Sequence, residues 1–180
     1  MSGALVSVKI TDFRKYISEY MDFPKSGILF RDISPLLASP VGMEAAVESF
    51  ASQFSQFNVD MIGGIESRGF LFSTLLAARI GVGSIMIRKP GKLPGKLMKQ
   101  EYVLEYGEAA LEIQKDAQIM GKSIILVDDL LATGGTIVAA KTLLEKCGAV
   151  VVACAVVVEL KALKGGEAVG LPILSLQSYE

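Results

Sequence analysis

Short apolar runs alternate along the chain with segments whose apolar residues recur every three or four positions. The runs predict strands at 59–65, 83–87, 123–128 and 149–158. The segments between them predict helices at 43–57, 70–80 and 135–147. Strands that alternate with helices pair in parallel through right-handed crossovers. The chain is therefore predicted to be one α/β unit, with a mostly parallel central sheet flanked by helices.

The first two helices should pack on the sheet through their apolar faces. The face of the first comprises Val47, Phe50, Ala51, Phe54 and Phe57. The face of the second includes Leu71, Leu75 and Ala78. The run AVVVACAVVV at 149–158 is shorter than the roughly 20 apolar residues that cross a bilayer, so it is expected to be a strand buried on both sides.

Composition excludes several kinds of chemistry. The chain has 180 residues, about one domain by length, and no histidine, so Ser-His-Asp and Cys-His catalysis and histidine-containing zinc sites are excluded. Its net charge of −1 gives no overall field for nucleic acid. Cys147 and Cys154 lack CxxC spacing and are expected to be structural. No secretory signal is recognisable, so a cytoplasmic protein is expected.

The stretch ILVDDLLATGGT at 125–136 joins a buried strand to a helix through a glycine-rich turn. A helix N-terminus has unpaired N–H donors and a partial positive charge, which suit a phosphate. The carboxylates of Asp128 and Asp129 suit hydroxyls or a metal ion. Ligands of parallel sheets bind beyond the carboxyl ends of the strands, where GIESRG at 64–69 also falls. This edge is predicted to bind a ligand that carries both phosphate and hydroxyls or Mg²⁺.

Other interpretations of these segments compete. A P-loop is excluded because no lysine follows Gly134 or Gly135. A structural Gly-Gly turn, with Asp128 and Asp129 as exposed acids at a strand end, stays open. The segment RKPGKLPGKLMKQ at 88–100 has five cations and no acid, which is common on solvated faces and weak nucleic-acid patches. Because the chain also contains the acidic motif at 125–136, binding of an anionic substrate by these cations is favoured over a solvated face or a nucleic-acid patch.

ILVDDLLATGGT resembles the phosphoribosyl-pyrophosphate (PRPP) motif of type I phosphoribosyltransferases. The resemblance narrows to the adenine phosphoribosyltransferases through FPKSGILFRDISPLL (23–37), GIESRGFLF (64–72), IRKPGKLPG (87–95), LEYG (104–107) and LEIQKDA (111–117). It implies the type I fold, with an N-terminal hood at about 1–38 and a flexible lid at about 90–107. It implies transfer of the 5-phosphoribosyl group from PRPP to N9 of adenine, giving AMP and pyrophosphate in purine salvage. Mg²⁺ and a homodimer are also implied, and no nucleic-acid or membrane partner is expected.

The resemblance assigns the 5′-phosphate of PRPP to one loop, in agreement with the helix N-terminus predicted above. That loop consists of Ala132, Thr133, Gly134, Gly135 and Thr136. Gly134→Val is expected nearly to abolish PRPP binding and to leave the fold largely intact, because a β-branched side chain would block the close backbone approach and resist a positive φ. Asp128 and Asp129 would face the ribose hydroxyls and stabilise a cationic sugar in the transition state.

The pyrophosphate end of PRPP needs cations, and the resemblance supplies Arg68, Lys89 and Lys92. It also counts Tyr102 among the PRPP-binding residues and implies a non-proline cis peptide within Glu66-Ser67-Arg68. Mg²⁺ would arrive with PRPP, with no protein ligand directly assigned.

The base would lie under the hood. Phe30 would stack on adenine while backbone groups of Leu29 and Arg31 read the purine edge, although a core position for Phe30 stays open. Glu105 matches the residue that handles the proton at adenine N7, and Tyr102 and Tyr106 flank it.

Two other functions compete with adenine transfer. A transferase for another purine should lack FRDIS and LEYG, and both are present. A non-catalytic PRPP-binding regulator usually carries an added nucleic-acid-binding domain, for which 180 residues leave little room. One departure from the expected pattern is the charge of Lys96, Lys99 and Glu101, where less charged residues are expected in relatives.

Overall fold

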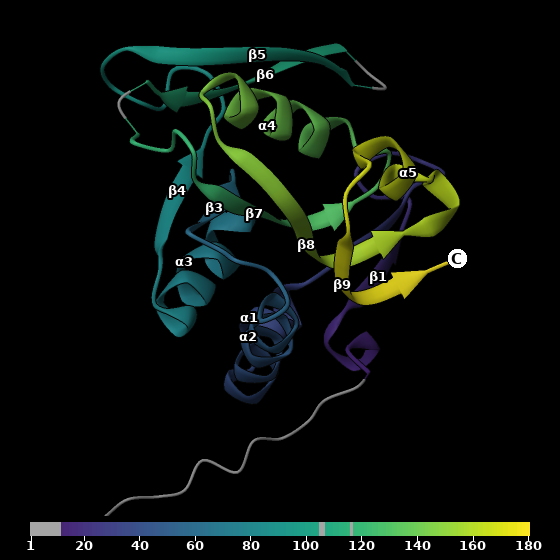
Figure 1. The fold of residues 1–180 in the computed structure, drawn as a ribbon. Coiled ribbons are helices and arrows are strands. Elements are labelled where there is room, and N and C mark those ends of the chain that lie inside the picture. Colours follow the sequence, from purple (N-terminus) through teal and green to yellow (C-terminus); the bar gives the residue numbers. More distant parts are fainter. Residues whose placement is uncertain (1–11, 105–106, 116) are drawn as a thin grey trace, which may run out of the picture.

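The centre of the molecule is a parallel five-stranded sheet in the order β4-β3-β7-β8-β9 (Figure 1). The computed structural model describes residues 12–104, 107–115 and 117–180. The sheet consists of β3 (Met61–Ile65), β4 (Gly83–Ile87), β7 (Ser123–Leu131), β8 (Val150–Leu160) and β9 (Ile173–Tyr179). The first four confirm the predicted strands to within a few residues, whereas β9 was not predicted.

Helices cover both faces of the sheet, as predicted. On one face lie α2 (Pro40–Phe54) and α3 (Gly69–Ile80), and on the other lies α4 (Gly135–Lys146) (Figure 1). The shorter helical pieces are η1 (Arg14–Tyr16), α1 (Ser34–Leu37), η2 (Lys161–Leu163) and α5 (Gly165–Val169). Within the described ranges, no helix combines the length and the apolar character that crossing a membrane requires.

Strand β7 separates two hydrophobic cores. Ile125 and Val127 pack under α2 and α3, while Ile124 and Leu126 pack under α4, because successive side chains of a strand point to opposite faces. All four are fully buried. Burial on both faces explains why this strand and β8 are continuous apolar runs in the sequence.

The predicted apolar face of α3 is wrong. Leu71 and Leu75 are each 46% exposed, whereas Phe72 and Leu76 are fully buried. Ala78 is exposed as well. Apolar residues surround this helix, so their spacing could not decide which side faces the sheet. The prediction for α2 is better, since Phe50 and Phe54 are in the core.

Two antiparallel hairpins lie outside the central sheet. The first pairs β1 (Ser18–Met21) with β2 (Leu29–Asp32), within the segment named as the hood. The second pairs β5 (Leu97–Leu104) with β6 (Gly107–Gln114) in a ribbon that runs over α4 (Figure 1). The sequence indicated only a polar segment at 97–104. A strand forms there because Met98 and Tyr102 pack against the core beneath the ribbon.

Candidate active site

A cavity of about 720 Å³ lies at the carboxyl edge of the sheet. The turn after β3, the loop after β4, the end of β7, the start of α4 and the β5-β6 ribbon line it. Six residues that the sequence assigned to PRPP are thereby brought together: Arg68, Lys89, Tyr102, Asp128, Asp129 and Thr136. The location agrees with the general rule for ligands of parallel sheets.

Asp128 and Asp129 are buried at the end of β7, each only 8% exposed. The Asp129 N–H donates to Asp128 Oδ1 at 2.9 Å. Burial raises the pKa of Asp128 well above its usual value, and the negative charge of Asp129 raises it further. This excludes the alternative of exposed acids at a strand end. Two adjacent, poorly hydrated carboxylates favour a ligand that brings hydroxyl donors or positive charge.

Arg68 reaches these carboxylates because α3 begins very close to β7. Its Nη2 atom lies 2.8 Å from Asp129 Oδ2. A Cβ atom on the next residue, Gly69, would lie 2.5 Å from the Val127 carbonyl oxygen, so only glycine allows this approach. The sequence assigned Arg68 to the pyrophosphate of PRPP and Asp129 to its ribose, and the structure pairs the two side chains directly.

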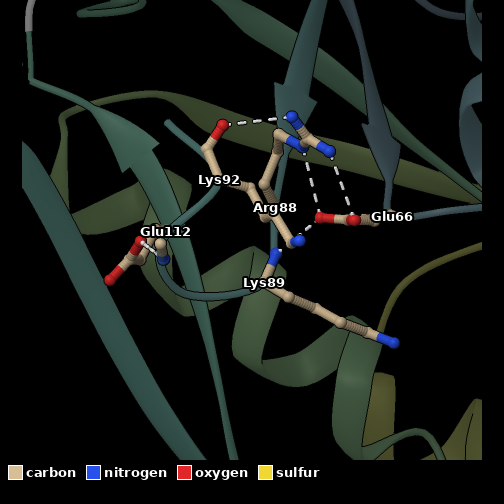
Figure 2. Close-up of polar contacts among 6 residues, drawn as sticks. Glu66, Arg88, Lys89, Lys92 and Glu112 are labelled. Atoms are coloured by element: carbon tan, nitrogen blue, oxygen red, sulfur yellow. Dashed lines mark hydrogen bonds and ion pairs between the residues drawn. The ribbon is translucent and has the colours of Figure 1, made fainter. Parts of the chain in front are cut away.

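Glu66 holds the start of the cationic loop after β4. Its carboxylate accepts hydrogen bonds from Arg88 Nε at 3.2 Å, from Arg88 Nη2 at 3.3 Å and from the Lys89 N–H at 2.9 Å (Figure 2). Burial raises the pKa of Glu66, but the Lys89 and Arg88 hydrogen bonds outweigh it and keep the pKa below its usual value. The peptide between Glu66 and Ser67 is cis, which confirms the predicted position.

A second carboxylate fixes the far side of the same loop. Glu112 Oε2 accepts a hydrogen bond from the Gly91 N–H at 3.0 Å, and Arg88 Nη1 donates to the Lys92 carbonyl at 3.1 Å (Figure 2). Lys92 is exposed and is not one of the described residues that line the cavity. Its role in binding pyrophosphate therefore stays a prediction, as does that of Lys89, which does line the cavity.

The predicted phosphate loop connects β7 to the N-terminus of α4. Gly134 is the residue before the helix and has φ of 87°, a conformation that glycine adopts readily. The first N–H groups of α4 have no preceding helical carbonyl to bind and remain suited to an anion. Thr136, in this first turn, lines the cavity with its Oγ1 atom 3.5 Å from Tyr102 Oη. Ala132, Thr133 and Gly135 lie in the same connection.

The predicted adenine-binding residues Leu29, Phe30 and Arg31 lie on β2. The Phe30 ring is half-buried, and its centroid lies 5.0 Å from that of Phe23 and 5.8 Å from the guanidinium carbon of Arg68. The described lining of the cavity includes no hood residue. The hood thus lies beside Arg68, and its contacts with a base stay a prediction.

Some predictions fall outside the described residues, and some lining residues were not predicted. Glu105 and Tyr106 lie outside the described part of the chain, so the role of Glu105 stays a prediction. Glu66, Lys99 and Glu101 line the cavity but were not assigned to it. The unexpected charges of Lys99 and Glu101 were the signal in the sequence that could have indicated a position at the cavity.

Comparisons with known proteins identify the family of this chain. The family model of the phosphoribosyl transferase domain matches residues 37–168. The adenine phosphoribosyltransferase of Stochomys longicaudatus is 51% identical over 168 residues, which are 91% of this chain and 93% of that protein. This chain belongs to the adenine phosphoribosyltransferase family. The member from Gluconobacter oxydans is 49% identical, over 94% of both chains.

Solved structures of adenine phosphoribosyltransferases share the fold. The one from Thermoanaerobacter pseudethanolicus has a TM-score of 0.89 and 43% identity, covering 93% of this chain and 98% of that one. The one from Saccharomyces cerevisiae, in complex with an imino-altritol bisphosphate and adenine, has a TM-score of 0.87 and 39% identity over 92% and 96% of the two chains. The fold is therefore that of the type I phosphoribosyltransferases.

The connection from β7 to α4, which the sequence assigned to the 5′-phosphate, is packed more tightly than the sequence indicated. A Cβ atom on Gly134 would lie 2.8 Å from the Gly165 carbonyl oxygen. The expectation that Gly134→Val leaves the fold largely intact does not agree with this contact. Such a substitution should lower stability as well as affect phosphate binding.

Gly81 provides a matched control, since it has φ of 77° with no other atom near its Cβ position. We expect Gly81→Ala to lower the free energy of unfolding by about 1 kcal/mol, and Gly134→Ala by about 3 kcal/mol, because only Gly134 also meets backbone. Urea unfolding of both variants measures the difference. Equal losses would show that the contact with Gly165 imposes no constraint.

Asp128→Asn should stabilise the protein at pH 7. Because the pKa of Asp128 is higher in the folded than in the unfolded chain, stability is lost as pH rises from about 4 through that raised pKa. Removing the charge should therefore increase the free energy of unfolding and raise Tm at pH 7. Below about pH 4 the advantage should disappear. Thermal unfolding at both pH values is the measurement, and a less stable variant at pH 7 would contradict the assignment.

Proposed function

We propose that this chain transfers the 5-phosphoribosyl group of PRPP to N9 of adenine, giving AMP and pyrophosphate in purine salvage. The observation that carries the proposal is one cavity lined by cations, by two buried carboxylates and by the first turn of a helix. These three kinds of group suit the pyrophosphate, the ribose and the 5′-phosphate of PRPP. Membership of the adenine phosphoribosyltransferase family supports the same reaction.

The reaction breaks the bond from C1′ of the ribose to pyrophosphate, forms the bond from C1′ to N9, and releases the N9 proton. Arg68 and Lys89 would stabilise the leaving pyrophosphate through their positive charge. Asp128 and Asp129 would face the ribose hydroxyls, where their charge favours a sugar that becomes cationic as the first bond breaks. Burial strengthens this effect because little water screens the two carboxylates. Glu105 is proposed to manage the purine proton.

We propose Mg²⁺ as the cofactor, bound together with PRPP. Four acids line the cavity (Glu66, Glu101, Asp128 and Asp129), against three bases (Arg68, Lys89 and Lys99). Protein side chains alone therefore do not balance the negative charge of PRPP. Mg²⁺ prefers six oxygen ligands and commonly takes one or two carboxylates with substrate phosphates and water, which fits the paired acids at the end of β7. The ion would supply charge neutralisation at the pyrophosphate.

The reaction is tested by incubating PRPP and Mg²⁺ with adenine, hypoxanthine or guanine and measuring each nucleotide formed. We expect AMP from adenine and about 10⁴-fold lower kcat/KM for the two oxopurines, because a buried hydrogen-bonding edge is left unpaired by the wrong base. A parallel reaction with EDTA should be inactive. Comparable turnover of hypoxanthine would contradict the choice of adenine, and PRPP binding without turnover of any base would indicate a regulator.

A homodimer is proposed from the exposed apolar side of α3 and β4. Leu71 and Leu75 are each 46% exposed and Met86 is 50% exposed. Exposure of these apolar side chains to water is unfavourable, and a second copy of the chain could cover them.

A cytoplasmic location stays a prediction of the sequence.

Sedimentation measures the oligomeric state directly. We expect twice the chain mass of 19.2 kDa for the unmodified protein, and a shift toward monomer for Leu75→Glu, which would bury a charge in the interface. Met120→Glu is the matched control, because Met120 is 82% exposed and lies outside α3 and β4. A monomer without any substitution would contradict the proposed dimer.

A further inference from the structure

Lys99 and Glu101 form an ion pair at the wall of the cavity. The Nζ atom of Lys99 lies 2.7 Å from Glu101 Oε1, and the two side chains are 48% and 73% exposed. Two positions apart on β5, they project from the same face of the strand. Because water screens both charges, the pair adds little to the stability of the fold. Neither side chain makes another hydrogen bond within the described part of the chain.

Three other charged side chains around the cavity, Arg68, Glu66 and Glu112, already have structural partners. Glu66 is bound by Arg88 and by the Lys89 N–H, and Arg68 is paired with Asp129. Strand pairing places Glu112 opposite Lys99, but Glu112 Oε2 already accepts the Gly91 N–H. The ammonium of Lys99 is thus held by the most exposed acid of the cavity. Both partners can be hydrated if they separate, so exchange leaves no buried, unpaired charge.

We propose that Lys99 binds the pyrophosphate group of PRPP, and that Glu101 holds Lys99 in the free protein and competes with that group. This inference rests on the proposed function and assigns to this site a third cation beside Arg68 and Lys89, which line the same cavity. On binding, the ammonium of Lys99 exchanges the carboxylate of Glu101 for a phosphate oxygen. The carboxylate of Glu101 and the phosphate of PRPP compete for one ammonium. Removing the charge of Lys99 must therefore lower the affinity for PRPP, whereas removing the charge of Glu101 must raise it.

Calorimetry with PRPP and Mg²⁺, without adenine, tests this competition in the full chain. We expect Lys99→Gln to raise the Kd of PRPP by about 3- to 10-fold, through loss of a charge-assisted hydrogen bond. Glu101→Gln should lower the Kd by about 2- to 5-fold, because the ammonium is then free for the substrate. Magnesium pyrophosphate, as a second ligand, should show the same two shifts. The KM for adenine should stay unchanged in both variants.

Three further variants distinguish exchange at Lys99 from a general effect of charge on the cavity. Lys96→Gln removes a cation from the same segment that does not line the cavity, and should change the Kd less than twofold. Lys99→Arg keeps the charge and should restore most of the affinity. In the double variant, the gain from Glu101→Gln should be smaller in the Lys99→Gln background than with Lys99 present.

The inference is overturned if Lys99→Gln binds PRPP within twofold of the unmodified protein, or if Glu101→Gln weakens binding. It is also overturned if Lys96→Gln has an effect as large as Lys99→Gln, since the net charge of the segment would then account for both. In each of these cases, turnover of adenine by the unmodified protein would still support the proposed function. An unmodified protein that does not bind PRPP would overturn both.

Discussion

The close approach of α3 to the end of β7 places the first cation of the site beside its carboxylates. Gly69 leaves no side chain between the helix and the Val127 carbonyl, so Arg68 reaches Asp129 at 2.8 Å. Without that ion pair, two adjacent carboxylates would lie buried against each other with little compensation. The raised pKa of Asp128 shows that compensation is incomplete, as the burial of that group and the charge of Asp129 both disfavour its ionised form. This residual cost is typical of sites that are built for a ligand and not for stability.

Charge balance is the second constraint on the cavity. Arg68 is paired with Asp129, Lys99 with Glu101, and Glu66 with Arg88. A polyanionic substrate must therefore compete with the protein's own acids for cations. The three pairs differ in exposure, and the Lys99 pair is the most exposed of them, so it should exchange most easily.

The two hairpins are attached to the rest of the molecule, one to α4 and one to β9, by polar and aromatic contacts. Gln100 on β5 accepts a hydrogen bond from Lys146 of α4 at 2.7 Å, and Tyr102 packs on the core beside Thr136. In the hood, the guanidinium carbon of Arg31 lies 3.9 Å from the ring centroid of Tyr179 on β9. Each hairpin is thus held by side-chain contacts with the element on which it packs, and Leu111 and Ile113 of β6 are buried in the core as well.

The sequence by itself determined the alternating strands and helices, and the position of the motif at 125–136. It could do so because buried parallel strands are continuous apolar runs and because a glycine turn before a helix is a local signal. The chemistry of Asp128 and Asp129 was also local, since neighbouring residues on one strand must lie at the same sheet edge.

Only the tertiary structure decided which side of α3 is buried, because Leu71 and Phe72 are equally apolar and packing alone separates them. It also decided the partners of the charged residues. The pairing of Arg68 with Asp129, and of Glu66 with Arg88, joins distant parts of the chain, and no periodicity within one segment records such contacts. The strand at 97–104 likewise depends on its pairing with β6 and on the core beneath it. Local patterns therefore specified the elements, and long-range packing specified how their charges meet.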